Sequence, residues 1–248
     1  MKTLFLAWQA PDIRSWFPVG RLDADAALDH ERFVFQYTQG ARSAQQRGFR
    51  PLLSFPDFKG RYQAESLFPM FGNRVLNSRR KGFDDYLRTL ALDHNDPLDI
   101  LAITGGERQT DNFEVFPKIE KQADNSFRCR FFLHGLRHMS DSAKERSKTL
   151  HEGDELGVSV ELTNPKTGVA IQLTSDDYAF IGWTPRYLVG DLLKSIASVQ
   201  EIRATVVKVN DGSDVPMNRR VLVEFYGRLP DGFQPMTGEE FQPIVSAH

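Results

Sequence analysis

The sequence predicts two domains: an α+β domain with a small antiparallel sheet and helices, followed by a mainly-β domain with one helix. Three observations support this. The length of 248 residues suits two domains, because domains cluster at about 100–150 residues. The first half mixes strand-like alternation with helical stripes, and the second half contains six short strand-like runs. We place the boundary in the turn cluster around Asp124, which gives domains 1–124 and 125–248.

Strand-like runs in the first domain occur at Thr3–Trp8, Phe17–Leu22 and Phe33–Tyr37. The last of these places aromatic side chains at every second residue, which is the period of a half-buried strand. A further strand-like run, 112–116, lies in the segment that leads to the boundary.

Two helices are predicted after these strands. Residues 83–92 carry apolar side chains on one helical stripe. Asp96 and Pro97 have the pattern of an N-cap followed by proline at the first helical position, and Gly105 is a typical residue for the helix end.

The second domain is expected to form a small barrel or sandwich, because short strands separated by Gly, Asn-Pro and Asp-Gly turns favour such folds. One helix, Tyr187–Val199, is expected among them, and the tail after Gly227 has three prolines and is expected to be a loose strap. The six predicted strands are Arg128–Leu133, Glu155–Leu162, Val169–Leu173, Tyr178–Trp183, Arg203–Val209 and Val221–Tyr226.

Composition excludes several classes of protein. Thirty-one Lys and Arg residues against thirty-three Asp and Glu give a net charge of -2, which argues against coating nucleic acid or membrane through bulk charge. The single cysteine, Cys129, cannot form an intramolecular disulfide or a multi-thiolate metal site, which fits a reducing compartment. No apolar stretch approaches the ~20 residues of a membrane span, and the first apolar run stops at Trp8, too early for a signal peptide. We expect a soluble, cytoplasmic protein.

Motifs for known catalytic sites are absent from the sequence. It contains no phosphate-binding loop, no HExxH, no GxSxG and no kinase signature. His134 and His138 have a paired-histidine spacing, but the segment has the pattern of a strand entering a turn, so we interpret them as ordinary histidines at a barrel rim. We expect no enzyme activity, no cofactor and no metal.

Five short pieces of the second half occur in an order that resembles the HIRAN domain: Gly135-Leu136-Arg137, Glu152–Leu156, Asn164-Pro165 with Ala170-Ile171, Ile181–Arg186, and Val221–Gly227. This domain is found beside helicase-type ATPases and in stand-alone bacterial proteins. The resemblance implies an OB-like, six-stranded barrel, and in helicase-associated members that barrel grips the 3′ end of single-stranded DNA.

The resemblance also implies a nucleic-acid site. Arg137 stands at the family's phosphate-binding arginine, within a basic run. The aromatic residue that follows this arginine in the family is His138 here. The family's Tyr-Asp pair after Asn-Pro is replaced by Lys166-Thr167, and its later aromatic that stacks on the base corresponds to Met217. Because the hydroxyl acceptor is missing, plain DNA or RNA binding is expected rather than end-specific binding. The candidate residues are Arg137, His138, Lys144, Arg146, Lys148, Asn164, Lys166, Thr167 and Met217.

Other interpretations of the basic run and of Trp183 stay open. The basic run also fits the solvated face of a small helix, 140–150, whose alternating charges favour solubility. Trp183 is more often a core residue than an exposed one.

The first half resembles the N-terminal subdomain of HipA-type serine/threonine kinase toxins through the pieces Val19–Leu22, Phe33–Tyr37, Leu53–Pro56, Leu67–Phe71 and Asn73–Leu76. Some relatives of these toxins encode the subdomain as a separate protein that docks on the kinase and restrains it. The family's Leu-Pro-Glu-Gly turn is replaced here by residues 77–80, and the kinase core is absent.

A partner surface is predicted from aromatic and basic side chains of this half, because large exposed aromatics mark interfaces. The alternative is that the aromatics fill the core. The candidate partner-binding residues are Phe55, Phe68, Phe71, Arg74, Arg79 and Arg80.

Three functions follow from these observations. The first is a non-enzymatic, antitoxin-like regulator whose residues 1–124 bind and inhibit a HipA-like kinase and whose barrel binds nucleic acid. The second is a single-stranded DNA (3′-end) binding protein in repair or phage defence. The third is an adaptor whose two domains both bind protein.

Overall fold

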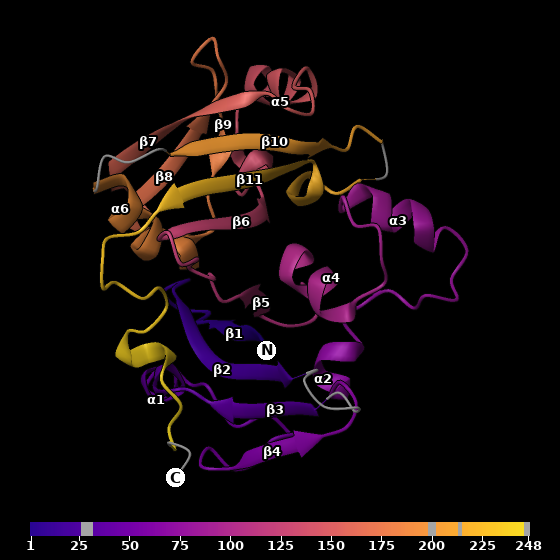
Figure 1. Ribbon diagram of the computed structural model, residues 1–248, viewed down its shortest axis with the longest axis vertical. Helices are drawn as coiled ribbons and strands as arrows, with labels where there is room; N and C mark the ends of the chain where they lie inside the picture. The colour runs from indigo at the N-terminus through magenta and orange to yellow at the C-terminus, as the bar shows by residue number, and fades with distance from the viewer. Residues whose placement is uncertain (26–31, 198–201, 213–214, 246–248) are drawn as a thin grey trace. The chain divides into compact units, whose positions relative to one another are not determined.

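The computed structural model describes residues 1–25, 32–197, 202–212 and 215–245 (Figure 1). The chain divides into two compact units. The first comprises Met1–Phe83, His94–Lys118 and the tail from Met236, and the second comprises Asp84–Asp93 and Ile119–Pro235. The expected boundary at Asp124 thus lies inside the second unit. No helix among the described residues is both long and apolar enough to cross a membrane.

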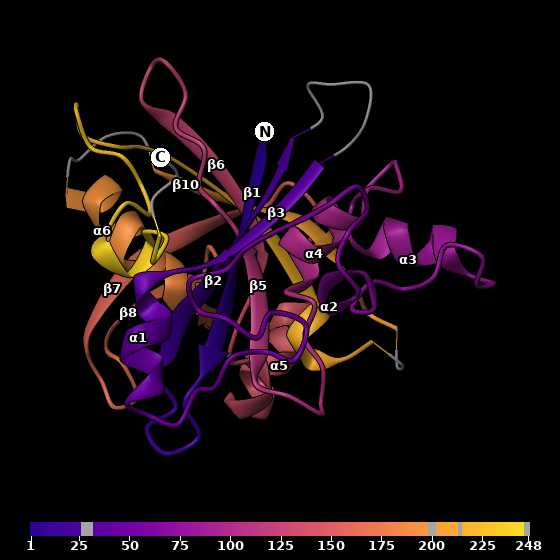
Figure 2. The same ribbon diagram turned by 90° about the horizontal axis from the view of Figure 1, so that it is seen from below.

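The first unit contains an antiparallel five-stranded sheet with the order β4-β3-β2-β1-β5. Figure 1 shows β1 to β4 side by side, and Figure 2 shows β1, β2 and β3 from below. The three strands predicted first are confirmed, and the run before the boundary forms the edge strand β5. The short strand β4 was not predicted. The strands are β1 (Lys2–Gln9), β2 (Trp16–Asp25), β3 (Arg32–Tyr37), β4 (Arg61–Ala64) and β5 (Phe113–Pro117).

The predicted ends of helix α4 (Pro97–Thr104) are confirmed. The Asp96 carboxylate accepts a hydrogen bond from the Leu98 amide at 2.8 Å, and Gly105 ends the helix with a φ of 70°. The first unit also contains α1 (Gln39–Gln45) and α2 (Pro69–Gly72). Helix α3 (Phe83–Thr89) confirms most of the other predicted helix, and nearly all of it belongs to the second unit.

Aromatic side chains fill the core of the first unit. Phe35, Tyr37, Phe55 and Phe71 are each at most 1% exposed, and the Phe35 and Phe55 rings stack with centroids 4.0 Å apart. The buried hydroxyl of Tyr37 donates to the Phe55 carbonyl and accepts from the Leu52 amide, each at 2.7 Å. The predicted period of two in β3 therefore places its aromatics inward, as expected.

The tail of the chain packs on the first unit. The Gln39 amide donates to the Gln242 carbonyl at 2.8 Å, the Ile244 amide donates to the Tyr37 carbonyl at 2.9 Å, and the ring of Phe241 lies 4.9 Å from that of Phe5. The tail includes the 3₁₀ turn η4 (Glu239–Phe241). It was predicted as a strap of the second domain, and these bonds assign it to the first unit instead.

The second unit contains an antiparallel six-stranded sheet with the order β6-β11-β10-β7-β8-β9. It is not a closed barrel, which corrects the prediction. Among the described residues, the outer strands β6 and β9 form no ladder, and one isolated bridge joins His134, which follows β6, to Trp183 in β9. The strands are β6 (Ser126–Phe132), β7 (Glu155–Asn164), β8 (Gly168–Thr174), β9 (Phe180–Trp183), β10 (Arg203–Val209) and β11 (Val221–Arg228).

More than one helix accompanies this sheet, so the expectation of a single helix was wrong. Helix α6 (Val189–Ala197) corresponds to the predicted one, whose last two residues lie outside the described part of the chain. Helix α5 (Asp141–Lys148) forms in the basic run. The described part of the unit also contains the 3₁₀ turns η1 (Leu136–His138), η2 (Arg186–Leu188) and η3 (Met217–Arg219).

Candidate nucleic-acid interface

An open pocket of about 330 Å³ lies in the second unit where η1, α5 and β9 meet. Its aromatic wall is formed by Phe180 and Trp183, and His138 adds an imidazole. The start of α5 contributes the small side chains of Ser142 and Ala143. Aromatic faces beside small residues leave room for a flat ring, which is what base stacking requires.

Trp183 is half-buried, and His134, Gly135, Phe180 and Glu161 contact it. Its backbone exchanges two hydrogen bonds with His134, at 2.9 and 3.1 Å. Its ring covers Gly135, where an added Cβ would come within 2.3 Å of the indole, and the Phe180 ring meets it edge-on at 4.5 Å. The indole nitrogen donates to Glu161 at 2.9 Å. This aromatic surface is therefore fixed before any ligand arrives.

Phe180 and Trp183 line the same pocket because β9 contains an irregularity. In the β8–β9 ladder, Leu173 pairs with Gly182 and Thr174 pairs with Phe180, so Ile181 is the extra residue. Such a bulge shifts the alternation of side chains by one. In a strand without the bulge, Phe180 and Trp183 would point to opposite faces of the sheet, because they are three residues apart.

The charges of two exposed arginines act on the half-buried His134. The pKa of His134 is lowered to about 4, chiefly by burial, and the charges of Arg186 and Arg137 lower it further. Arg137 also donates from Nε to Nε2 of His138 at 2.9 Å. Both guanidinium groups thus lie close to the backbone bridge that fixes Trp183, so this edge of the unit is positively charged.

The turn η3, which carries Met217, lies against η1, which carries Arg137 and His138. The structure therefore brings together three of the residues that the HIRAN resemblance singled out. Met217 is half-buried, whereas Arg137 and His138 are exposed.

The cations of α5 are engaged with acidic groups. The ammonium groups of Lys144 and Lys148 pair with Asp141 at 3.1 Å and Glu145 at 2.6 Å, three residues earlier on the same helix. This is the solvated, alternately charged helix that we considered as the alternative for the basic run. Exposed pairs of this kind contribute little, about 0.3–0.5 kcal/mol, and a phosphate can replace the carboxylate.

Arg146 differs from these lysines. Its guanidinium donates to both carboxylate oxygens of Asp177 at 3.1 and 3.2 Å, to Asp176 at 2.7 Å and to the Thr149 hydroxyl at 2.7 Å. Two carboxylates already neutralise this arginine. Its contacts connect α5 to the β8–β9 turn, and we therefore remove it from the predicted phosphate contacts.

The side chains of Asn164 and Thr167 form hydrogen bonds within the β7–β8 turn. The side-chain oxygen of Asn164 accepts from the amides of Lys166 and Thr167 and from the Thr167 hydroxyl, at 3.0–3.2 Å. The amide nitrogen of Asn164 donates to Glu161 at 2.9 Å. Asn164 thus supports the carboxylate that holds Trp183, and Lys166 is left exposed on the turn.

Burial removes three of the predicted partner-binding residues from the surface of the first unit. Phe55 and Phe71 belong to the core. The Arg74 side chain is 2% exposed and bonds to Asp111 at 2.6 and 3.2 Å and to the carbonyls of Met70 and Gly106. Phe68 is half-buried and packs edge-on against Phe55 at 5.1 Å, and Arg79 and Arg80 are exposed.

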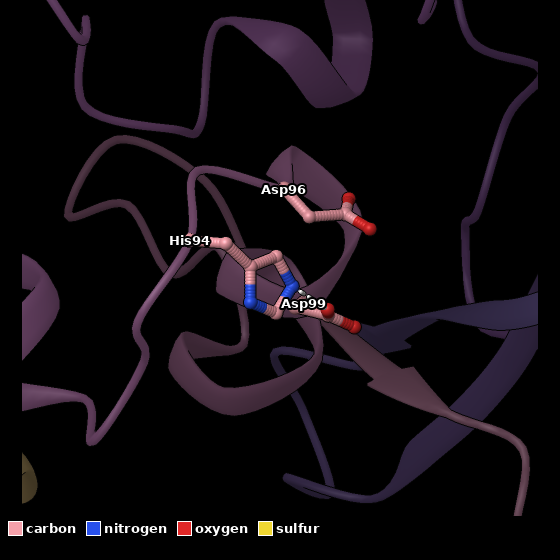
Figure 3. Close-up of side chains that lie close together, drawn as sticks. All are labelled: His94, Asp96 and Asp99. Atoms are coloured by element: carbon pink, nitrogen blue, oxygen red, sulfur yellow. Dashed lines mark hydrogen bonds and ion pairs between the residues drawn. The ribbon is translucent and has the colours of Figure 1, made fainter.

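A cluster of His94, Asp96 and Asp99 lies at the start of α4 in the first unit (Figure 3). Among the described residues it is the one group of three such side chains close enough to share a metal ion. However, the Lys2 ammonium bonds to Asp96 at 2.6 Å and to Asp99 at 2.8 Å. Burial alone would lower the pKa of Lys2, but these carboxylates outweigh it and the pKa is raised. Because the Lys2 ammonium already occupies one oxygen of each carboxylate, we do not propose a metal at this cluster.

Sequence reasoning missed Phe180, Trp183 and Arg186 as site residues. The run Ile181–Arg186 was noticed as part of the resemblance, but nothing in it shows that the bulge in β9 brings the two aromatics together. Arg186 and Arg137 both act electrostatically on His134, which the fold joins to the end of β9 through its bridge with Trp183.

Comparison with known proteins gives a partial structural likeness to two solved structures. No family model matches the chain, and no curated protein matches it. Among solved structures, the chain is similar to a protein from Lactobacillus plantarum, with 15% identity and a TM-score of 0.33 over 42% of this chain and 99% of that one. It is also similar to the HIRAN domain of human HLTF, with 16% identity and a TM-score of 0.29 over 45% of this chain and 79% of that domain.

With TM-scores of 0.33 and 0.29, these likenesses leave both sequence resemblances, to the HIRAN domain and to the HipA N-terminal subdomain, as predictions. Likeness of this extent does not identify a ligand, so the function is argued from the side chains of the chain itself.

Proposed function

We propose that the second unit binds single-stranded nucleic acid and that the protein acts by binding rather than by catalysis. The observation that carries this proposal is a half-buried, rigid tryptophan that lines an open pocket beside two exposed arginines. A base stacks on Trp183, and the neighbouring phosphates are bound by Arg137 and Arg186. Stacking on an aromatic contributes about 1–3 kcal/mol per base and tolerates every base.

The overall charge agrees with a local site. At a net charge of -2, the protein is not attracted to nucleic acid as a whole, so affinity has to come from a few cations near the pocket. The exposed Lys166 and the lysines of α5 supply further charges for the backbone of a longer strand.

Binding along the strand is proposed in preference to capture of a 3′ end. The side-chain oxygen of Asn164 and the hydroxyl of Thr167 are bonded to one another within their turn. The Glu161 carboxylate is occupied by Asn164 and Trp183. Among the described residues of this turn, these polar groups are thus already engaged in bonds that fix the turn and Trp183.

The test is fluorescence anisotropy with a labelled oligo(dT) of about 12 nucleotides, a length within the usual site sizes. Trp183→Leu keeps an apolar side chain at the pocket, and Arg137→Gln removes one charge. We expect each to weaken binding at least fivefold, with circular dichroism spectra unchanged. Unaltered affinity in both variants, or no binding by the wild-type protein, would show the proposal to be wrong.

A 3′-phosphorylated oligonucleotide of the same length tests end recognition. We expect it to bind as tightly as the unmodified strand. A loss of tenfold or more would favour 3′-end capture instead. A matched oligoribonucleotide shows whether RNA is bound as well.

For the first unit we propose docking on a HipA-like kinase as a second function. It is supported by the sequence resemblance and by the exposure of Arg79 and Arg80. A tagged pull-down from the native host, with and without nuclease, tests it. A kinase that copurifies after nuclease, and that is lost with Arg79→Glu/Arg80→Glu, is the expected result. Full kinase activity in the complex would contradict inhibition.

A further inference from the structure

The turn between β8 and β9 presents an aromatic side chain in an unusual backbone conformation. Tyr178 has a φ of 61° and is 88% exposed. The left-handed region disfavours residues with a bulky side chain, and such positions persist only where the surrounding structure enforces them. A glycine would occupy this position without strain, so packing does not explain the tyrosine.

Hydrogen bonds within the turn fix its geometry. The Ser175 amide donates to the Ala179 carbonyl at 2.9 Å, and the Tyr178 amide donates to the Ser175 carbonyl at 3.0 Å. The Ser175 hydroxyl donates to Asp177. This bond, with help from Arg146, lowers the pKa of the Asp177 carboxyl, so the carboxylate stays ionised and bonded.

Arg146 holds the turn from outside. From α5 it donates to Asp176 and Asp177, the two residues that precede Tyr178. The same helix contributes Ser142 and Ala143 to the pocket. One helix therefore sets the position of both the pocket wall and the turn.

Tyr178 directly precedes two residues of the pocket wall in the chain. These two residues, Ala179 and Phe180, line the pocket, and consecutive Cα atoms are 3.8 Å apart. An exposed tyrosine alone is ordinary. Here the tyrosine stands in a turn with a positive φ that hydrogen bonds hold in place, next in the chain to an aromatic pocket. Such a side chain is ordered before binding, so less conformational entropy is lost when a ligand contacts it.

We propose that Tyr178 is a second stacking platform for single-stranded nucleic acid, adjacent to Trp183, and that Arg146 is its positioning residue. The inference rests on the proposed nucleic-acid function. A strand whose first base stacks on Trp183 extends beyond the pocket, where a second base meets the exposed tyrosine ring. A strand that fills only the pocket does not reach it.

The experiment compares oligo(dT) of about 12 nucleotides with a very short oligonucleotide of about 2 nucleotides. Tyr178→Ala is expected to weaken binding of the longer strand about fivefold or more, because one base loses its aromatic partner, and to leave the short strand unaffected. Tyr178→Phe keeps the ring and should bind normally. Leu162→Ala, at another exposed side chain of the unit, is the matched control and should change neither affinity.

The positioning role of Arg146 is tested in a double-mutant cycle. Arg146→Met and Tyr178→Ala should weaken long-strand binding to a similar extent, and the double variant should be no weaker than the single ones. Thermal unfolding separates binding from folding: Tyr178→Gly relieves the positive φ, so it should raise the Tm while weakening binding.

The outcomes distinguish this inference from the proposed function. If the long strand binds with dependence on Trp183 but Tyr178→Ala is unchanged, the second platform does not exist and the proposed function stands. If wild-type protein binds no oligonucleotide, both are wrong. Equal losses for long and short strands would assign Tyr178 a structural effect on the pocket and overturn the inference.

Discussion

The indole nitrogen of Trp183 donates to Oε2 of Glu161 at 2.9 Å, and the same oxygen accepts from Asn164 at 2.9 Å. The hydrogen bonds from Asn164 and then Trp183 lower the pKa of Glu161, so the acceptor is a carboxylate at neutral pH. The sequence singled out Asn164 as a nucleic-acid contact, but the structure gives it an indirect role: it orients the group that orients the tryptophan.

Removing this carboxylate should loosen the aromatic pocket. Glu161→Leu is expected to weaken oligonucleotide binding about fivefold, the equivalent of ~1 kcal/mol for one lost hydrogen bond. Glu161→Gln retains an acceptor oxygen and should bind more tightly than the leucine variant. Anisotropy titrations measure this, with Glu155→Leu, an exposed glutamate at the start of the same strand, as the control. An equal loss in the control would contradict the assignment.

Salt dependence should separate the arginines of the second unit. For single strands the slope of log K against log salt concentration is about -0.7 per neutralised phosphate. Arg137→Ala should make the slope shallower by about that amount, because its guanidinium is exposed. Arg146→Ala should lower affinity without changing the slope, because Asp176 and Asp177 already neutralise it. The reverse pattern in titrations at several salt concentrations would restore Arg146 as a phosphate contact.

The second unit should lose stability in mild acid. The pKa of His134 is lowered to about 4 in the folded protein, below its ordinary value of about 6.5, so folding favours the neutral imidazole. Stability is fully present above pH ~6.5 and falls as the pH approaches 4, by up to about 1.4 kcal/mol per pH unit. Urea unfolding followed by tryptophan fluorescence between about pH 7 and 4.5 measures this. His134→Asn should flatten the dependence, and an equally steep curve in that variant would assign it to other groups.

Arg74 should matter for folding, whereas Arg79 and Arg80 should not. The Arg74 guanidinium is buried against Asp111. Arg74→Ala leaves that carboxylate and two carbonyls without their donor, at a cost of about 3 kcal/mol. Arg79→Ala and Arg80→Ala change exposed side chains and should stay within about 0.5 kcal/mol. Denaturant unfolding measures all three, and comparable small effects would mean that the buried pair contributes little.

The hydroxyl of Tyr37 should stabilise the first unit. Burial raises its pKa to about 12, so it remains protonated and donates to Phe55 while accepting from Leu52. Tyr37→Phe removes both bonds, with an expected loss of about 1–3 kcal/mol. Tyr62→Phe is the control, because the Tyr62 hydroxyl bonds to Asp57 in an exposed loop where water can replace it. Thermal unfolding compares the two, and equal shifts in Tm would contradict the prediction.

Local patterns predicted most of the elements. The aromatic alternation in β3, the Asp96-Pro97 start and Gly105 end of α4, and the strands of the second half were all evident in short stretches of sequence. These features depend on a residue and its close neighbours: on side-chain period, on capping, and on backbone angles that glycine permits. The short strand β4 was missed because four residues give too little periodicity.

The candidate site depended on contacts that no local pattern records. Arg137 and His138 were found because a resemblance pointed to them, and the structure adds Trp183, Phe180 and Arg186 from a different part of the chain. Likewise, Arg74 and Arg79 look alike in sequence, yet one is buried against Asp111 and the other is exposed. A charged residue's role depends on the partner that the fold places beside it.

The sequence by itself predicted the antiparallel sheet of the first half, six strands in the second half, the caps of α4 and a nearly balanced net charge. Only the tertiary structure decided that the tail joins the first unit, that the second sheet stays open, and that the bulge at Ile181 turns Phe180 and Trp183 toward one pocket. Secondary structure follows from interactions over a few residues. Strand register, burial and the partner of each ion pair follow from contacts between distant segments.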